Sequence, residues 1–327
     1  MKVSGPTIRT TDIFPQTSNS EPSCAVIVAS FRPGRLIDQC VRSLLGQQSA
    51  PTYQIIVVDS STDGTAERLQ RAFPTIEVVT LDHQTHQATA RNIGIAQTRA
   101  PFVAITDQDC IVPPDWLAHL LARHQEGRYA IVGGAIGNGT PQSRVGTASY
   151  LIEFNEFMPV GTTRLVRMVP HCNICIRREI FTSVGPFVAV PPGAEDQVFN
   201  FLLCREGQQI LFDPSIVVTH INRSEFRGFL RHQQLLGIGS AVARRIVPIP
   251  GQLFVRHPTL ASLLPFVRLF RTTGRLLRYN RPALLRYLQL LPILLPGYLQ
   301  WTKGFFLGLR QELPTNTPIF GKEITAY

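Results

Sequence analysis

Short apolar runs alternate with amphipathic stretches through the first third of the chain. Each run is rich in β-branched residues, and the stretch after the first one repeats apolar positions at helical spacing, as in Leu36, Cys40, Val41 and Leu44. The runs span residues 25–29, 55–58, 76–81 and 102–106. Strands that are joined by crossover helices build a parallel sheet, so this pattern predicts an α/β fold.

The same pattern continues to about Ile221. Further strands are predicted at residues 129–136, 173–178, 210–212 and 216–218. A helix is predicted to begin at Glu195, directly after a loop rich in Pro and Gly. These elements extend the sheet, so we expect residues 24–221 to form one α/β domain.

Beyond Ile221 the chain becomes basic and rich in leucine. Fourteen Lys and Arg stand against two Asp and Glu between positions 221 and 312, although the whole chain carries a formal charge of only +10. The longest uncharged run, 287–302, contains Pro292 and Pro296 and is shorter than the ~20 residues that span a bilayer. We therefore expect residues 222–327 to form a helical basic extension that lies on a membrane without crossing it.

A basic surface attracts nucleic acid, anionic lipid or an anionic acceptor equally well. Seven leucines within 284–295 offer more apolar surface than a nucleic-acid arm carries. We therefore expect an anionic membrane surface as partner, and no nucleic acid. An ordinary helical cap, with its leucines buried against the α/β domain and its arginines solvated, is the alternative.

Composition narrows the class and the compartment. Apolar residues make up 44% of the chain and charged residues 17%, which excludes disordered and coiled-coil proteins. Six irregularly spaced cysteines favour a reducing compartment over a disulfide framework. Residues 1–23 contain no apolar signal-peptide core, so we expect a flexible tail and a cytoplasmic protein, peripheral at the inner face of the membrane.

Polar segments follow the predicted strands at their carboxyl ends, where a parallel sheet builds its ligand crevice. No GxGxxG follows the first strand and no GxxxxGK[ST] occurs, so phosphate charge must be met in another way. Asp107 and Asp109 alternate on an extended segment, which lets both carboxylates address one Mg²⁺ or Mn²⁺. Taken alone, two acids in a turn are equally compatible with a solvated loop.

Taken in order, these segments resemble glycosyltransferase family 2, whose members have the GT-A fold. The resemblance covers about residues 24–221, roughly two thirds of the chain. The segments that carry it are 26–33, 57–65, 90–95, 102–110, 113–116, 173–178, 184–187 and 195–196. It implies a Rossmann-like, mostly parallel sheet flanked by helices, and transfer of a sugar from a nucleotide-diphosphate donor to an acceptor hydroxyl with inversion.

The resemblance also implies roles for particular residues. Asp109 would be the principal ligand of Mg²⁺ or Mn²⁺, with Asp107 beside it on the donor. Asp196 would be the base that takes the acceptor proton, together with Glu195, although capping of the helix is the alternative for this pair. The remaining donor-site residues would be Ser30, Phe31, Asp59, Arg91 and His220, with Asp59 at the nucleotide base and Arg91 at base or phosphate.

Departures from the family pattern refine the expected activity. Gln108 replaces the usual acid between the two aspartates, and Phe31-Arg32 replaces the common Tyr-Asn. No Gln-x-x-Arg-Trp motif follows, so a non-processive enzyme of glycan or polysaccharide biosynthesis is expected, with a cell-surface glycan, glycolipid or lipid-linked acceptor. The rival interpretations are a metal-dependent nucleotidyltransferase and a non-catalytic, membrane-docked binding module.

Overall fold

The structure, a computed structural model, describes residues 21–191 and 193–313. The tail that we expected over residues 1–23 lies outside the described residues, apart from its last three. Of these, Ser23 donates its backbone N–H to the carbonyl oxygen of Thr52 at 2.8 Å, one residue ahead of the first strand.

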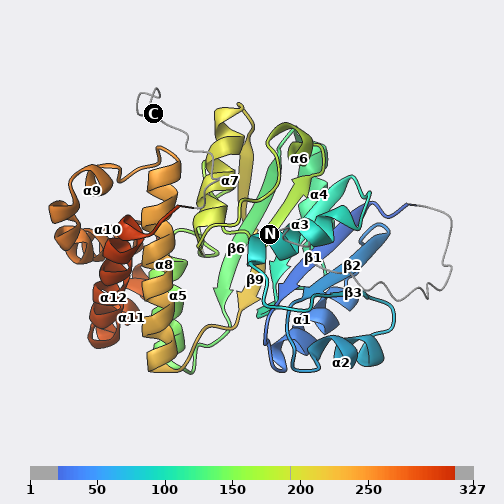
Figure 1. Ribbon diagram of the computed structural model, residues 1–327, viewed down its shortest axis with the longest axis horizontal. Helices are drawn as coiled ribbons and strands as arrows, with labels where there is room; N and C mark the ends of the chain where they lie inside the picture. The colour runs from blue at the N-terminus through green and yellow to red at the C-terminus, as the bar shows by residue number, and fades with distance from the viewer. Residues whose placement is uncertain (1–20, 192, 314–327) are drawn as a thin grey trace, which may run out of the picture.

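One nine-stranded sheet runs through the molecule (Figure 1). Its strands are β1 (Cys24–Ser30), β2 (Tyr53–Asp59), β3 (Glu77–Thr80), β4 (Phe102–Asp107), β5 (Cys110–Ile111), β6 (Ile131–Asn138), β7 (Arg164–Val166), β8 (Asn173–Arg177) and β9 (Ile210–His220). They lie in the order β3-β2-β1-β4-β8-β6-β9-β5, and β7 pairs with β9. The first four strands are parallel and β8 runs antiparallel between β4 and β6, which confirms the predicted α/β class.

Helices cover both faces of the sheet because alternate strand residues point to opposite faces. In β1, Val26 and Val28 belong to one apolar core, whereas Ala25 and Ile27 belong to the other. The first core lies under α1 (Leu36–Leu45), α2 (Thr65–Ala72), α4 (Trp116–Glu126) and α5 (Arg144–Glu153). The second lies under α3 (Gln87–Ala96), α6 (Ile180–Ser183) and α7 (Ala194–Arg205).

The neighbouring strands β1, β2 and β4 end at the same edge of the sheet. Ser30 lies beside Asp59 in the register of β1 and β2, and Ala29 lies beside Asp107 in the register of β1 and β4. The helices that follow β1 and β3 cover opposite faces, so the chain changes direction between β1 and β4. A crevice opens outside the strand ends at such a position in open α/β sheets.

The two apolar runs at 210–212 and 216–218 belong to one strand, β9, and not to two. The register against β6 jumps there, from Gly134 beside Asp213 to Ala135 beside Val217. Asp213 stabilises the irregularity, because its carboxylate accepts hydrogen bonds from the backbone and hydroxyl of Ser215. The apolar pattern located both halves, but it did not predict a strand that continues through Pro214.

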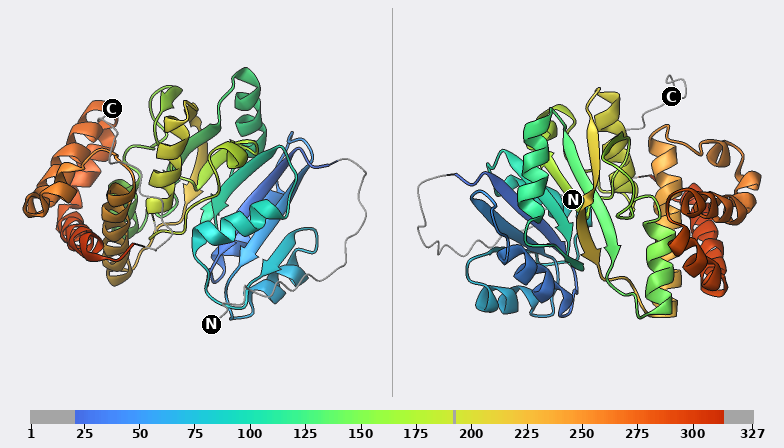
Figure 2. Two further views of the ribbon diagram at one scale, coloured as in Figure 1. Left: turned by 45° about the horizontal axis from the view of Figure 1, so that its top comes forward. Right: turned by 180° about the vertical axis from the view of Figure 1, so that it is seen from behind.

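The extension beyond Ile221 is helical, as expected, and forms a layer beside the sheet (Figures 1 and 2). It consists of α8 (Phe226–Ile246), α9 (Leu253–Arg256), a 3₁₀ helix (Pro258–Leu263), α10 (Leu264–Tyr279), α11 (Arg281–Gln289) and α12 (Leu291–Arg310). Helices α8 and α12 pack closely because glycines remove side chains at their contact. A Cβ at Gly237 would overlap the carbonyl oxygen of Trp301, and one at Gly304 would overlap that of Gln234.

The leucines of the extension divide between an interior and a surface. Leu290 and Leu294 are fully buried in the core that continues through α5 to the sheet, whereas Leu285 is 66% exposed. Along α10, Phe266 is 60% exposed and Phe270 is 71% exposed, with Leu277 further along the same face. Among the described residues, no helix is both long and apolar enough to cross a membrane.

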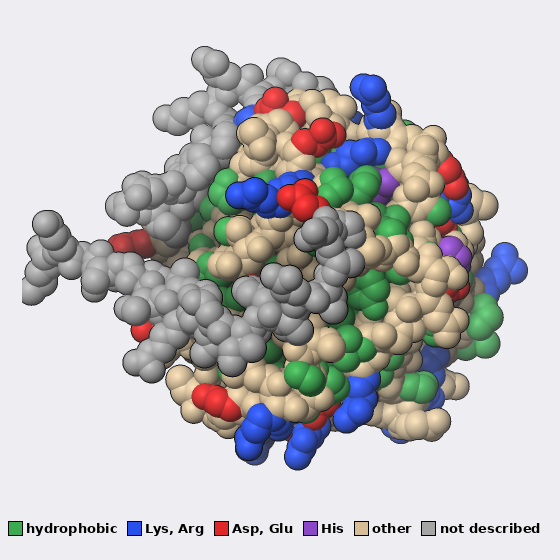
Figure 3. Space-filling model, turned by 90° about the vertical axis from the view of Figure 1, so that its right-hand side faces the viewer, with side chains coloured by type: hydrophobic (Ala, Val, Ile, Leu, Met, Phe, Trp, Pro, Cys, Tyr) green, Lys and Arg blue, Asp and Glu red, His purple; other side chains and the backbone are tan. Residues whose placement is uncertain are grey.

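The opposite end of the molecule has a different surface. Figure 3 views the molecule from the side of β2 and β3, where acidic and basic side chains are interspersed with scattered apolar ones. Of the apolar side chains that remain exposed, those in the C-terminal helices outnumber those of the sheet and its helices. The concentration of exposed apolar side chains is therefore a property of the extension.

Candidate active site

A cleft of about 960 Å³ opens outside the carboxyl ends of β1 and β4 and reaches helices α7, α8 and α10. Eight of the nine predicted site residues line it, namely Ser30, Phe31, Arg91, Asp107, Asp109, Glu195, Asp196 and His220. The ninth, Asp59, is fully buried directly behind Ser30. The structure thus brings together side chains that are up to 190 positions apart in the chain.

Asp59 is fixed at the end of β2 by two hydroxyl groups. Ser30 and Ser61 each donate a hydrogen bond of 2.8 Å to its Oδ1, while its Oδ2 is buried without a hydrogen-bond partner. Burial raises the pKa of Asp59, and the two hydroxyl groups lower it in part. The carboxyl group therefore keeps one oxygen without a hydrogen-bond partner, although this oxygen lies behind Ser30 and not on the surface of the cleft.

Arg91, on α3, joins the two halves of the carboxylate cluster. Its Nη2 lies 2.9 Å from Asp107 Oδ1 and its Nη1 lies 3.4 Å from Asp196 Oδ1. The guanidinium is only 2% exposed, and the pKa of Arg91 rises because the surrounding carboxylates outweigh the effect of its burial. Since α3 begins beside the edge of the sheet where β1 and β4 end, the side chain of Arg91 reaches both Asp107 and Asp196.

Asp196 has a further partner that sequence reasoning missed, His171. The backbone N–H of His171 donates to Asp196 Oδ2 at 3.0 Å, and its ring Nδ1 lies 2.9 Å from Asp196 Oδ1. Burial alone would raise the pKa of Asp196, but His171 and Arg91 together hold it at about 2. Asn200, one turn later on α7, contacts His171 Nε2 at 2.9 Å and fixes the ring.

Glu195 differs sharply from its neighbour. Its side chain is buried and its Oε2 has no hydrogen-bond partner. Burial, together with the charge of Asp196, raises the pKa of Glu195 to about 8. At neutral pH the first turn of α7 therefore presents one ionised carboxylate, Asp196, and one neutral carboxyl group, Glu195.

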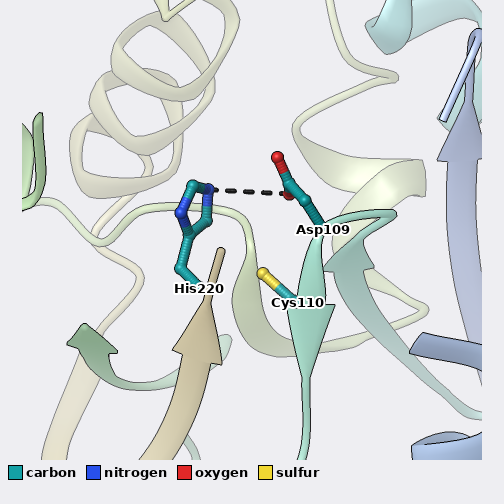
Figure 4. Close-up of side chains that lie close together, drawn as sticks. All are labelled: Asp109, Cys110 and His220. Atoms are coloured by element: carbon teal, nitrogen blue, oxygen red, sulfur yellow. Dashed lines mark ion pairs between the residues drawn. The ribbon is translucent and has the colours of Figure 1, made fainter. Parts of the chain in front are cut away.

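Among the described residues, Asp109, Cys110 and His220 form a set of metal-type ligands (Figure 4), whose ligand atoms lie within 4.8 Å of one another. His220 Nε2 points toward Asp109 Oδ1 at 3.6 Å, while its Nδ1 contacts Asn222 Oδ1 at 3.0 Å. Burial raises the pKa of the Cys110 thiol, so this sulfur stays protonated. The oxygen of Asp109 and the nitrogen of His220 fit a divalent cation such as Mn²⁺, whereas the thiol does not.

Asp107 was predicted to share the metal with Asp109, but its contacts are different. Its Oδ1 accepts hydrogen bonds from Arg91 and from Gln87 Nε2, the latter at 3.0 Å. Both aspartates line the same cleft, and repulsion from Asp109 contributes to a raised pKa of Asp107, after burial and against the effect of Arg91. Gln87 gave no signal in the sequence, because a lone glutamine at the start of a helix is common.

Gln108 explains one departure from the family pattern. Its Oε1 accepts a hydrogen bond of 2.9 Å from the backbone N–H of Phe31, and its Nε2 donates to the carbonyl oxygen of Phe31. Arg32 then takes a left-handed backbone conformation with φ of 44° and donates its N–H to Ser61 Oγ. Gln108 therefore links the loop after β1 to the loop after β4. An ionised acid could not form both bonds, because a carboxylate accepts hydrogen bonds but cannot donate them.

Solved structures with a similar fold define the class first. TarS from S. aureus, in complex with UDP-GlcNAc, superposes with a TM-score of 0.52 over 88% of this chain and 92% of its own, at 15% identity. GalNAc-T7 with UDP, GalNAc and Mn²⁺ gives a TM-score of 0.50 over 71% of this chain and 51% of its own, also at 15% identity. At such identities the likeness shows the fold, which is a GT-A-type α/β fold.

The sequence then gives the family. Residues 25–185 match the model of Glycosyl transferase family 2, so this part of the chain belongs to that family. Similar curated proteins include Glycosyltransferase AglE of Haloferax volcanii, 26% identical over 51% of this chain and 56% of its own length. Another is the pre-mycofactocin glycosyltransferase of Mycobacterium tuberculosis, 27% identical over 75% of this chain and 50% of its own. The chain thus spans about half the length of these relatives.

Proposed function

We propose that this protein is an inverting glycosyltransferase that moves a sugar from a nucleotide-diphosphate donor to an acceptor hydroxyl. The observation that carries the proposal is the double contact of Arg91, which holds Asp107 and Asp196 on one side chain. A donor-side carboxylate and a carboxylate able to act as base thereby lie at opposite ends of one guanidinium. All three side chains line the same cleft, where a donor sugar could meet both carboxylates.

The donor nucleotide would lie over the ends of β1 and β2. There Ser30 and Phe31 border the pocket, and Asp59 would meet an N–H of the base only if Ser30 moved aside, since its Oδ2 is buried without a partner. Arg91 has both its Nη groups engaged with carboxylates. Its contacts favour a role in positioning Asp107 and Asp196 over direct contact with the base.

A divalent cation, Mg²⁺ or Mn²⁺, would be held by Asp109 and His220, with Asp107 beside it. When bound, the cation neutralises the charge that the leaving diphosphate develops as the glycosidic bond breaks. The buried side chain of His220 is fixed by Asn222, so its Nε2 is already directed at Asp109. The similar structure of GalNAc-T7 contains UDP and Mn²⁺, which supports the choice of a divalent cation.

Asp196 would accept the proton of the acceptor hydroxyl as its oxygen attacks the anomeric carbon. Its pKa of about 2 keeps it ionised, and the His171 backbone and Arg91 fix its orientation. A carboxylate with so low a pKa is a weak base, so proton transfer would come late, after most of the bond to the donor has broken. Glu195, neutral at pH 7, would keep the pocket from carrying a second charge.

The decisive experiment measures nucleotide release. The purified protein with Mn²⁺ and a panel of UDP-, GDP- and dTDP-sugars should release nucleotide diphosphate slowly with at least one donor. Asp196→Asn should lose transfer while keeping donor affinity, and Asp82→Asn, an exposed aspartate outside the cleft, should match the wild type. Silence across the panel, with no donor binding by calorimetry, would favour a non-catalytic binding module.

We further propose that residues 222–327 dock the catalytic domain, residues 24–221, on an anionic membrane at its cytoplasmic face. Support comes from the exposed stripe of Leu263, Phe266, Phe270 and Leu277 on and beside α10, flanked by arginines such as Arg278. Apolar side chains in the interface and cations at lipid headgroups bind such surfaces together. A non-processive transferase would there meet a glycolipid or lipid-linked acceptor.

A sedimentation assay tests the docking. The protein should pellet with vesicles that contain anionic lipid, and Phe270→Ser should weaken this binding by roughly tenfold because one large side chain no longer inserts. Phe226→Ser, which changes an exposed phenylalanine outside the stripe, is the matched control. Equal binding by both variants would count against the stripe on α10 as the docking face.

A further inference from the structure

Four arginines gather on the wall of the cleft that faces away from the sheet. Arg244 comes from α8, and Arg268, Arg271 and Arg275 come from successive turns of α10. All four line the same cleft as Asp196. Arginines three and four positions apart share one helix face, so α10 directs this charge to one place.

The carboxylates around this cluster do not balance its charge. Glu156 pairs with Arg271 at 2.9 Å and also with Arg275. Arg244 donates only to neutral oxygens, those of Ser240, Pro250 and Gln197. Glu153, the other acid nearby, is engaged by His232 and Gln233. Within the described part of the chain, Glu156 is thus the one carboxylate that pairs with any of the four arginines, and it pairs with two of them.

Arg268 is the clearest case of an unmet cation. Its Nε is buried without a hydrogen-bond partner, and no carboxylate pairs with it among the described residues. Its guanidinium carbon lies 4.1 Å from the ring centre of Trp301 and 5.6 Å from that of Tyr298. Stacking on Trp301 fixes the plane of the group and offsets part of its desolvation, but it supplies no acceptor for the N–H groups.

The cluster is held under electrostatic strain. Burial first, and then repulsion from neighbouring arginines, lowers the pKa of Arg244 to about 10. Burial has the same leading effect on Arg268, whose pKa also falls to about 10. Both groups remain cations at neutral pH, so an anion that entered the cluster would relieve this repulsion.

The cluster lies next to the reacting groups. Arg244 Nη1 contacts Gln197 Oε1 at 3.4 Å, and Gln197 directly follows Asp196 on α7. The arginine wall therefore adjoins the start of α7, and Asp196 and Gln197 both line the cleft there. An anionic group bound by the arginines would lie on the wall of the cleft that α8 and α10 form, in the same cleft as Asp196, whereas Asp59 lies at the end of β2.

We propose that Arg244, Arg268 and Arg271 form a binding site for a phosphate or diphosphate group carried by the acceptor substrate. The proposal rests on the function proposed above, because it assigns the arginine wall to the acceptor of that reaction. Phosphoryl oxygens match both the donor count and the planar geometry of paired guanidinium groups. The phosphate has two possible sources, a soluble sugar phosphate or a lipid-linked sugar diphosphate.

Calorimetry with inorganic pyrophosphate tests the site directly. EDTA is present throughout, so that no cation at Asp109 can hold the probe. The wild type should bind pyrophosphate, and Arg268→Met and Arg271→Met should each weaken binding by roughly tenfold or more. Arg278→Met changes an exposed arginine of α10 that does not line the cleft, and it should bind as the wild type does.

The two cleft variants, Arg268→Met and Arg271→Met, complement each other in case one of them fails to fold. Arg268→Met also removes the stacking on Trp301, so its melting temperature is measured, and Arg268→Lys should recover part of the affinity. The side chain of Arg271 is 58% exposed, so Arg271→Met should disturb folding less. No binding by the wild type, or equal affinity in the wild type and both cleft variants, would overturn the proposal.

Farnesyl diphosphate distinguishes the two sources of phosphate. Binding at least roughly tenfold tighter than that of pyrophosphate supports a lipid-linked acceptor, and equal affinity supports a soluble one. The donor site is measured separately, as binding of UDP in the presence of Mn²⁺. Failure there with pyrophosphate binding intact would refute the proposed transferase, whereas the reverse result would refute only the phosphate site.

Discussion

The two walls of the cleft treat charge in opposite ways. On the sheet side, Arg91 pairs with both Asp107 and Asp196, and His171 is a further partner of Asp196. On the helical side, arginines outnumber their acidic partners and Arg268 has none among the described residues. Both walls are partly buried, so burial does not explain the difference.

The difference separates two tasks of a binding cleft. Groups that must hold a fixed geometry satisfy each other, because an internal partner keeps them in place before any ligand arrives. Groups that must receive a charged ligand remain incompletely satisfied, because a partner already present would have to be displaced. Under the proposed function, the sheet wall would be a preorganised reaction centre and the helical wall would receive an anion.

The largest effect is expected from removal of Arg91, which should disrupt the ion pairs on the sheet side of the cleft. Arg91→Met leaves Asp107 and Asp196 facing each other without a cation, and loss of one partner from a buried ion pair costs about 3 to 5 kcal/mol. Transfer should fall by roughly a hundredfold or more, because the base and the donor carboxylate lose their spacing. Urea unfolding and nucleotide release measure the two effects.

Arg35→Met is the matched control for that variant. Arg35 forms an exposed ion pair with Asp38, and its side chain is 81% exposed. A surface pair of this kind contributes little, so the free energy of unfolding should change by less than about 1 kcal/mol. If Arg91→Met behaved like this control, the contact of Arg91 with the two acids would have no structural importance.

The pH dependence of stability tests the same side of the cleft through the protonation of Glu195. The pKa of Glu195 rises from 4.5 to about 8 on folding, so between these values only the folded protein keeps the proton. The free energy of unfolding should therefore fall as pH rises, by up to about 1.4 kcal/mol per pH unit. Glu195→Gln, which stays neutral, should lose less stability over this interval, as seen in its melting temperature.

A control for this prediction is Glu67→Gln on the surface helix α2, which should follow the wild type at every pH. The contribution of Asp196 to the free energy of unfolding has the opposite pH dependence, because its pKa of about 2 lies below the value of 3.8 for a free side chain. Its contribution is present above about pH 4 and is lost as pH falls toward 2. A wild type whose stability rose between neutral and alkaline pH would contradict the neutral state of Glu195.

The helical wall depends on close packing of α8 against α12, and a smaller effect is expected there. Gly304→Ala would place a methyl group against the carbonyl oxygen of Gln234. The helices must separate slightly, at a cost of about 1 to 3 kcal/mol. Gly274→Ala on α10 meets nothing within 4 Å and should be neutral or stabilising. Thermal unfolding of both variants checks the contrast.

Much of the sheet and its polar edge followed from the sequence, for a simple reason. Apolar runs mark strands, and parallel strands of one sheet end at one edge, so Ser30, Asp59 and Asp107 had to converge. The family resemblance then added Asp196 and His220, which periodicity alone does not connect to that edge. The roles of these residues stay predictions until the variants are measured.

Other parts of the site could not be read from the sequence. His171 lies 25 positions before Asp196 in an irregular segment, and only the tertiary structure brings its backbone N–H to that carboxylate. The arginines of α10 were visible as charge, but their direction depends on how α10 packs against α12. The same packing decides that Leu294 is buried while Leu285 is exposed, although both occur in one leucine-rich segment.

The irregularity in β9 has a consequence for how this cleft can change during evolution. Before it, odd-numbered Leu211 belongs to the core under α1 and α4; after it, even-numbered Val218 does. The extra residues thus exchange the two faces of the strand and bring His220 to the side of Asp109. Gain or loss of a single residue there would turn the imidazole away, so an insertion in the middle of β9 can remove a ligand of the cleft without substituting it.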